Sequence, residues 1–283
     1  SANTYPPIII DSERAIAPDL SEYQDGVLYL QGIKRGSDEY VNPFKKYLEK
    51  AVSYYSTKKT LLYAEKPHPF YELYVCNDVK YHKYHLTGVR DTKPEITISD
   101  ATVEKLEAES KYIIIEGIGG IGKSMFLTHL FLSSAQNSTY SSVVPLFLSL
   151  KDYKDTTDNV VDFIWKSICE YDSKISKKDI IEALQNKELI LLLDGFDEIQ
   201  TSVRESFQSD LEAFIKSYNG NTIIMTSRPI YDSFVSFSKF SVFDIKPLTK
   251  KQALALIDKL EFWDEIAKKS FMEALDNKLY YSH

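Results

Sequence analysis

Hydrophobic residues follow two spacings along the chain, and these spacings predict most of its secondary structure. Between residues 111 and 245, short apolar runs alternate with segments whose apolar residues recur every three or four positions. Short apolar runs are typical of strands buried on both faces, and the longer spacing is typical of amphipathic helices. We predict strands at 113–115, 143–150, 188–193, 222–229 and 241–245, and helices at 123–135, 159–171, 176–186, 201–218 and from 249 onward. This alternation predicts an α/β fold, in which helices cover both faces of a doubly wound parallel sheet.

The segments before residue 111 are less regular. They predict short strands at 5–10, 26–30, 71–76 and 81–89, and helices at 42–57 and 100–109. Asn42 and Pro43 favour the start of the first helix, and either Ser99 or Asp100 is expected to cap the second. The apolar face of helix 42–57 is expected to pack on a core, with a membrane-surface helix as the alternative.

A glycine-rich loop lies between the strand at 113–115 and the helix that follows. Its sequence, Gly117-Ile118-Gly119-Gly120-Ile121-Gly122-Lys123-Ser124, fits G-x-x-x-x-G-K-[ST] at every fixed position, and Met125 continues into the helix. Glycine backbone can turn successive N–H groups toward a phosphate, and a helix N-terminus adds further donors with partial positive charge. Lysine supplies a full charge for the β- and γ-phosphates, and the serine hydroxyl can ligate Mg²⁺. The motif therefore predicts a nucleotide site rather than a simple connecting turn.

Acidic and basic residues follow two later strands. Asp194, Asp197 and Glu198 come directly after the apolar run at 188–193, and Arg228 ends the run at 222–229. Open α/β sheets bind ligands at the carboxyl ends of their strands. Asp194 is thus expected to hold Mg²⁺, and Asp197 or Glu198 to activate water; a helix cap without a ligand is the alternative for Asp194. Arg228 is expected to contact the γ-phosphate, with an ion pair to a surface carboxylate as its alternative.

Composition narrows the function classes. The 283 residues carry a net charge of −7, and 43% of them are hydrophobic, which suits a globular protein and argues against a broad nucleic-acid surface. No apolar run approaches the roughly 20 residues of a membrane span, and only two cysteines are present, so we expect a cytoplasmic protein. Cys76, His82 and His85 match no zinc spacing, so a metal site there is the weaker alternative to hairpin polar faces.

These motifs together resemble the NACHT family of STAND signalling NTPases. The resemblance rests on Gly117–Ser124, on Leu191-Leu-Leu-Asp-Gly-Phe-Asp-Glu198, on Thr226-Ser-Arg-Pro229 and on Ile245-Lys-Pro-Leu-Thr249. Gly195 directly after Asp194, with two acidic residues beyond it, distinguishes this family from related ATPases. The segment 70–75 is similar to the corresponding part of bacterial NACHT proteins, many of which are anti-phage sensors.

The resemblance implies an ASCE/AAA-like P-loop NTPase fold that binds ATP or ADP with Mg²⁺. Gly117 to Met125 would hold the phosphates, Ser124 and Asp194 the metal, and Tyr74 and Val75 would flank the adenine. The expected organisation is an N-terminal α+β extension at 1–69, a nucleotide-binding domain at 70–246 and the start of a small helical subdomain at 247–283.

The resemblance also implies a switch module that hydrolyses ATP slowly and self-oligomerises in a longer receptor with an unknown trigger. Family members carry winged-helix and repeat-type sensor domains, so we expect this chain to be a fragment. A constitutive P-loop ATPase, such as a motor or loader, and a scaffold that binds nucleotide without hydrolysis remain alternatives.

Overall fold

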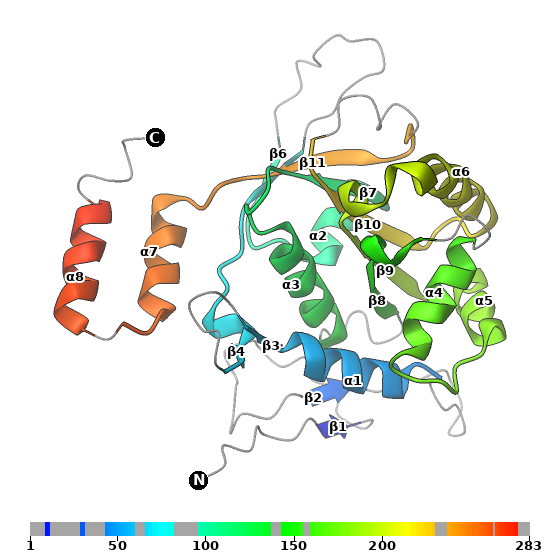
Figure 1. Ribbon diagram of the computed structural model, residues 1–283, viewed down its shortest axis with the longest axis horizontal. Coiled ribbons are helices and arrows are strands. Elements are labelled where there is room, and N and C mark those ends of the chain that lie inside the picture. Colours follow the sequence, from blue (N-terminus) through cyan, green and yellow to red (C-terminus); the bar gives the residue numbers. More distant parts are fainter. Residues whose placement is uncertain are drawn as a thin grey trace.

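The molecule is organised around one mixed sheet, shown in Figure 1. The computed structural model describes residues 9–11, 29–31, 43–59, 66–81, 96–136, 143–154, 159–229, 237–262 and 264–276. Seven strands run in the order β6-β5-β11-β7-β10-β9-β8. Their bounds are β5 Val79–Tyr81, β6 Ile96–Ile98, β7 Tyr112–Glu116, β8 Val144–Ser149, β9 Leu189–Asp194, β10 Thr222–Ser227 and β11 Ser241–Ile245.

The five strands from β7 to β11 are mutually parallel, as the sequence predicted. In the central strand β10, Met225 lies opposite Ile114 of β7 on one side and Leu193 of β9 on the other. All of β10 and nearly all of β9 are buried, which is why both sequences are continuous apolar runs rather than alternating ones. Strands β5 and β6 are antiparallel additions beyond β11.

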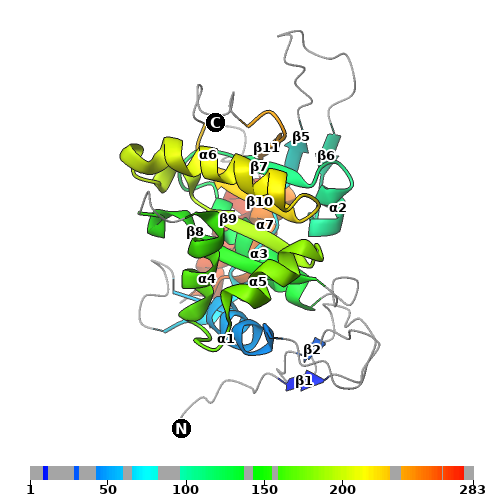
Figure 2. The same cartoon turned by 90° about the vertical axis from the view of Figure 1, so that its right-hand side faces the viewer.

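Helices cover both faces of this sheet, as Figures 1 and 2 show. Connections between parallel strands are right-handed, so their direction across the sheet decides which face the helix covers. The connection from β7 to β8 places α3 on one face, and the connections from β8 to β9 and from β9 to β10 run the opposite way and place their helices on the other. The helices are α3 Lys123–Gln136 on the first face, and α4 Val160–Cys169, α5 Lys177–Gln185 and α6 Thr201–Ser217 on the second. The expectation of a doubly wound α/β fold is therefore confirmed.

An N-terminal helix covers the β8 edge of the sheet. Helix α1, Lys45–Tyr55, contacts α3, and the Tyr47 hydroxyl accepts a hydrogen bond of 3.0 Å from the backbone N–H of Phe147 in edge strand β8. The ring of Tyr55 lies 4.4 Å from that of Phe147. Because an uncovered edge strand exposes unpaired backbone groups, this helix protects the sheet as well as enlarging its core.

The remaining short elements complete the described part. Strands β1 Ile9–Asp11 and β2 Tyr29–Gln31 pair in parallel, and β3 Thr57–Lys58 pairs with β4 His68–Pro69. The 3-10 turns are η1 Phe70–Glu72, η3 Leu150–Asp152 and η4 Phe196–Glu198, and α2 covers Val103–Glu107. Most of the two strands predicted at 5–10 and 26–30 lies outside the described residues, as does all but Tyr81 of the strand predicted at 81–89.

The prediction of a strand at 71–76 is wrong. Phe70–Glu72 forms a 3-10 turn, residues 74–78 are irregular, and the strand of this region is β5 instead. The alternating aromatic residues that suggested a strand pack against one another. The Phe70 and Tyr74 rings stack 4.8 Å apart, and Tyr74 lies against His129 of α3. Aromatic packing therefore determines the backbone conformation here, because a turn brings these side chains to one face.

Helix caps are only partly as predicted. Thr102, not Ser99 or Asp100, caps α2 by accepting from the backbone N–H of Lys105. Helix α1 follows Phe44 without a side-chain cap, and Asn42 lies outside the described residues. Thr249 caps the next helix through a reciprocal capping box with Gln252.

The last two helices stand beside the sheet domain. Helices α7 Lys250–Lys259 and α8 Glu265–Ala274 are drawn apart from the sheet in Figure 1. Ile257 is the one buried residue of α7, and α8 has none. Across the residues that the structure describes, no helix combines the length and the apolar character that crossing a membrane requires.

Candidate functional site

The glycine-rich loop connects β7 to α3 at the carboxyl edge of the sheet. The Gly117 N–H donates to the Ser227 carbonyl at 3.2 Å, which ties the loop to the end of neighbouring strand β10. The Phe126 N–H donates to the Gly122 carbonyl at 2.8 Å and so begins the helix directly behind the loop. Gly122 has φ of +103°, a left-handed conformation that residues with a side chain rarely adopt. The loop therefore has the backbone and the helix start that a phosphate site requires.

Lys123 lies folded over this loop. Its Nζ donates to the carbonyl oxygens of Gly117 and Ile118, at 2.7 and 3.1 Å. Burial lowers the pKa of Lys123 below its ordinary value, the charge of Asp197 opposes that shift, and Arg228 adds to it. The ammonium group thus already lies among the charged groups that the sequence predicted for this site.

Asp194 ends strand β9 and is held by a threonine of β10. The Thr226 hydroxyl donates to Asp194 Oδ1 at 2.7 Å and accepts from the Gly195 N–H at 2.8 Å. No role for Thr226 was predicted from the sequence, because its position opposite Asp194 depends on the strand register. Gly195 has φ of +81°, and a Cβ there would lie 3.1 Å from Cδ of Glu198. The positive φ therefore favours glycine at 195, and a side chain there would crowd the nearby Glu198 carboxylate.

Asp197, Glu198 and Arg228 come together at the same edge. Arg228 Nε lies 3.0 Å from Asp197 Oδ2, and the Arg228 backbone N–H donates to Asp197 Oδ1 at 3.0 Å. The ion pair that was the alternative for Arg228 is thus present, but its carboxylate is one of the predicted site residues. Glu198 is exposed and lies outside this pair.

Two further residues reach the site from segments where the sequence indicated no chemistry. Lys58 of β3 has its ammonium 5.1 Å from the centre of the Tyr55 ring; burial lowers the pKa of Lys58, and the charge of Asp194 opposes this. Asn77 is buried beside the loop, with its Oδ1 3.5 Å from where a Cβ on Gly122 would lie. No motif marks either residue, since both approach through tertiary folding alone.

Tyr74 and Val75, the two residues predicted to contact adenine, differ in how far they are buried. Tyr74 is buried, and its ring packs against Phe70 at 4.8 Å and against His129 at 5.1 Å. Its ring is thus packed among protein side chains, which argues against stacking on a base. Val75 is partly exposed, and its contact with adenine stays a prediction.

The metal-ligating groups at the loop are few. Among the described residues, no group of three His, Cys, Asp or Glu side chains could hold a metal, and His82 and His85 lie outside those residues. Ser124 and Asp194 offer one hydroxyl and one carboxylate at a phosphate-binding loop. This set fits Mg²⁺, which usually keeps several waters and shares its ligands with substrate phosphates, and does not fit a cage built by protein alone.

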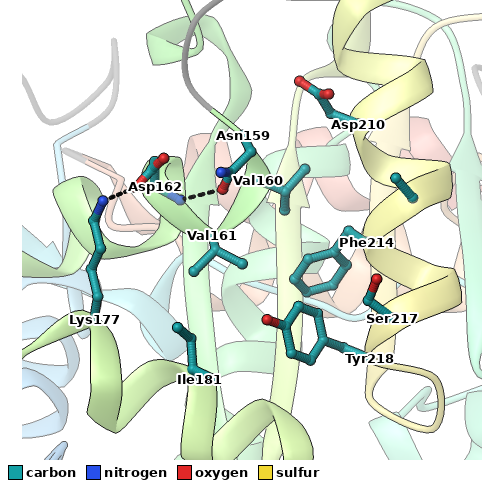
Figure 3. Close-up of a pocket in the computed structure, with 11 residues that line it drawn as sticks. Asn159, Val160, Val161, Asp162, Lys177, Ile181, Asp210, Phe214, Ser217 and Tyr218 are labelled. Carbon is teal, nitrogen blue, oxygen red and sulfur yellow. Dashed lines mark hydrogen bonds and ion pairs between the residues drawn. The ribbon is translucent and has the colours of Figure 1, made fainter.

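A separate pocket lies on the opposite side of the sheet domain from α3, between α4, α5 and α6 (Figure 3). Its volume is about 380 Å³, and none of the predicted site residues lines it. Lys177 pairs with Asp162 at its rim, and Asp210 accepts a hydrogen bond of 2.8 Å from Tyr153. Because these charged groups already have protein partners, the pocket gives no indication of an ionic ligand.

The parallel sheet, the glycine-rich loop before a helix and the acidic turn on a nearby strand define a nucleotide-binding P-loop NTPase. The family model named NACHT domain matches residues 111–261, which is more than half of the chain. The protein therefore belongs to the NACHT family, as its motifs indicated. The matched region includes the loop, the acidic turn, Arg228 and α7, and it begins after the segment 70–110, which the sequence had suggested for the same domain.

Two further comparisons add little. No curated protein matches this sequence. Among solved structures, PCH-2 of C. elegans is similar with a TM-score of 0.37 and 12% identity, over 62% of this chain and 45% of that chain. The chain thus spans less than half of the length of PCH-2, and a likeness of this degree carries no weight for function.

Proposed function

We propose that this chain is the nucleotide switch module of a STAND-type receptor of the bacterial anti-phage kind. It binds ADP in a resting state and exchanges it for ATP in an active state. In a longer protein, exchange drives self-association in response to a trigger that the sequence does not name. The observation that carries this proposal is the meeting of Lys123, Asp194, Asp197 and Arg228 at one edge of the sheet.

Each residue has a role that its position supports. Backbone N–H groups of the loop and Lys123 bind the phosphates, and Ser124 with Asp194 binds Mg²⁺, which supplies charge neutralisation at the β- and γ-phosphates. Thr226 fixes the Asp194 carboxylate through its 2.7 Å hydrogen bond. Asp197 or Glu198 activates the attacking water, and Arg228 contacts the γ-phosphate.

Slow hydrolysis is expected because P-loop switches hydrolyse nucleotide slowly when no partner protein assists them. Unassisted members turn over at about 10⁻⁴ to 10⁻² s⁻¹, because charge in the transition state is incompletely neutralised. A steady rate near 1 s⁻¹ without any trigger, which is ordinary for metabolic enzymes, would instead favour a constitutive ATPase.

The experiment compares Lys123→Ala and Glu198→Gln with the unaltered chain. Calorimetric titration should show at least a tenfold loss of ATP and ADP affinity for Lys123→Ala, because the loop loses its full positive charge. Glu198→Gln should retain ATP affinity but lose single-turnover hydrolysis. Lys187→Ala serves as the matched control, since Lys187 lies at the far end of the sheet before β9. Equal ATP affinity for Lys123→Ala and the control would refute the proposal.

A further inference from the structure

Asp197 and Arg228 are joined by two contacts that use both oxygens of one carboxylate. Oδ2 lies 3.0 Å from the Arg228 side-chain Nε, and Oδ1 accepts from the Arg228 backbone N–H at 3.0 Å. The side chain of Arg228 is 63% exposed and that of Asp197 only 15%. The pair thus has a fixed acidic member and an accessible basic member.

The acidic member is fixed by its own turn. Arg204 of α6 donates to the carbonyl oxygens of Asp197 and Ile199, both at 3.1 Å, and its guanidinium lies over the Phe196 ring. Phe196 is fully buried. Any exchange of partners at this ion pair therefore involves the Arg228 side chain rather than the acidic turn.

The guanidinium lies directly over the phosphate-binding loop. Its central carbon is 3.5 Å from where a Cβ on Gly119 would be, and both terminal nitrogens are 3.7 Å from that point. Lys123 donates to loop carbonyl oxygens in the same arrangement. Both cations of the predicted site thus contact protein oxygens at positions that phosphate oxygens would compete for.

From these contacts, and on the basis of the function proposed above, we propose that Asp197 is a positioning residue that restrains Arg228, and that the γ-phosphate of ATP takes the guanidinium over from it. A planar guanidinium binds carboxylate and phosphate with the same fork of donors, so either can replace the other. ADP has no γ-phosphate and leaves the Asp197–Arg228 pair intact. The pair thereby distinguishes ATP from ADP. Activation of the attacking water is then the role of Glu198, which lies outside the pair.

Four chains test this inference: the unaltered one, Asp197→Asn, Arg228→Ala and the double variant. The Asp197→Asn side chain retains an oxygen for the Arg228 backbone N–H but loses the charge that restrains the guanidinium. Calorimetry with Mg²⁺ and either ADP or a non-hydrolysable ATP analogue should show the analogue-to-ADP affinity ratio rising about two- to fivefold in Asp197→Asn, since exposed ion pairs are weak. Arg228→Ala should lower that ratio, and the double variant should match Arg228→Ala.

Rescue and hydrolysis complete the test. Asp197→Glu restores the carboxylate and should return the ratio toward that of the unaltered chain. Glu198→Gln should lose single-turnover hydrolysis, and the same assay on Asp197→Asn separates a positioning role from a role as the base. The inference is overturned if Asp197→Asn leaves the ratio unchanged, lowers it as Arg228→Ala does, or abolishes hydrolysis at unchanged affinity, because the last result would make Asp197 the base. Failure of the unaltered chain to bind either nucleotide would instead refute the proposed function.

Discussion

Helices α3 and α7 both adjoin the segment at 71–78, but they are held by different forces. Nine of the fourteen residues of α3 are buried, and the helix packs on β8, β9 and β10 of the main sheet, on β2 and on α1. Helix α7 buries Ile257 alone, and two of its side chains donate hydrogen bonds to the segment 71–78. Lys259 donates to the carbonyls of Tyr71 and Tyr74, and Gln252 donates to the carbonyl of Cys76.

This difference predicts different stabilities. Burial of apolar side chains contributes about 1.5–3 kcal/mol for each large residue, whereas a hydrogen bond that water can replace contributes about 0.5–1.5 kcal/mol. The helix behind the phosphate-binding loop is therefore fixed to the sheet, while α7 is attached by contacts that can be exchanged. The nucleotide switch proposed above would use this combination of a fixed site and a separable neighbour.

The two helices are nevertheless connected through one residue, Tyr71. Nε2 of His129 in α3 lies 3.1 Å from the Ala101 carbonyl, which only accepts, so Nε2 carries the proton. Nδ1 then accepts from the Tyr71 hydroxyl at 3.2 Å, and the Tyr71 carbonyl accepts from Lys259. A path of hydrogen bonds through Tyr71 thus runs from the loop helix to α7.

The largest expected effect comes from the buried helix. Phe131→Ala in α3 should lower the free energy of unfolding by about 3–5 kcal/mol, because it leaves a cavity beside Tyr55 and Phe147. Ile257→Ala in α7 is the matched comparison and should cost less than about 2 kcal/mol, since its surroundings can relax. Urea unfolding followed by circular dichroism measures both. Equal losses would remove the distinction between the two helices.

An intermediate effect is expected from His129 in acid. Burial lowers its pKa from 6.5 to about 4, so the unfolded chain binds more protons between these values. Titration of His129 should leave the free energy of unfolding unchanged above pH 6.5. As the pH decreases from 6.5 toward 4, it should lower that free energy by about 2–3 kcal/mol. His129→Gln offers a donor and an acceptor without titrating, and should lack this part of the loss. Urea titrations of both chains at pH 7.5 and 4.5 measure the difference, and identical pH dependence would contradict it.

The smallest effect is expected at the polar attachment. Lys259→Met retains the length of the side chain but removes both hydrogen bonds to the 71–74 carbonyls, at a cost of about 0.5–1 kcal/mol. Amide hydrogen exchange should quicken in α7 while protection in α3 stays unchanged. Lys251→Met, at an exposed position of the same helix, is the control. Faster exchange in both helices would show that α7 is not separable from the sheet domain.

The sequence by itself determined the parallel strands, the helices between them and the phosphate-binding loop. Burial on both faces produces apolar runs such as 188–193, and a loop that must approach phosphate needs glycine at fixed spacing, so both are visible in one dimension. The capping box of Thr249 and Gln252 was predictable in part for the same reason, since its partners are three residues apart.

Only the tertiary structure decided which groups meet. Thr226 reaches Asp194 because two strands are in register, and Asp197 reaches Arg228 across 31 positions of sequence. The segment 71–76 forms a turn and irregular backbone rather than a strand because its aromatic rings pack together and on α3, and a local pattern cannot show what a ring packs against. The local spacing of residues reflects backbone conformation and burial. Pairing between distant side chains depends instead on the order of strands in the sheet.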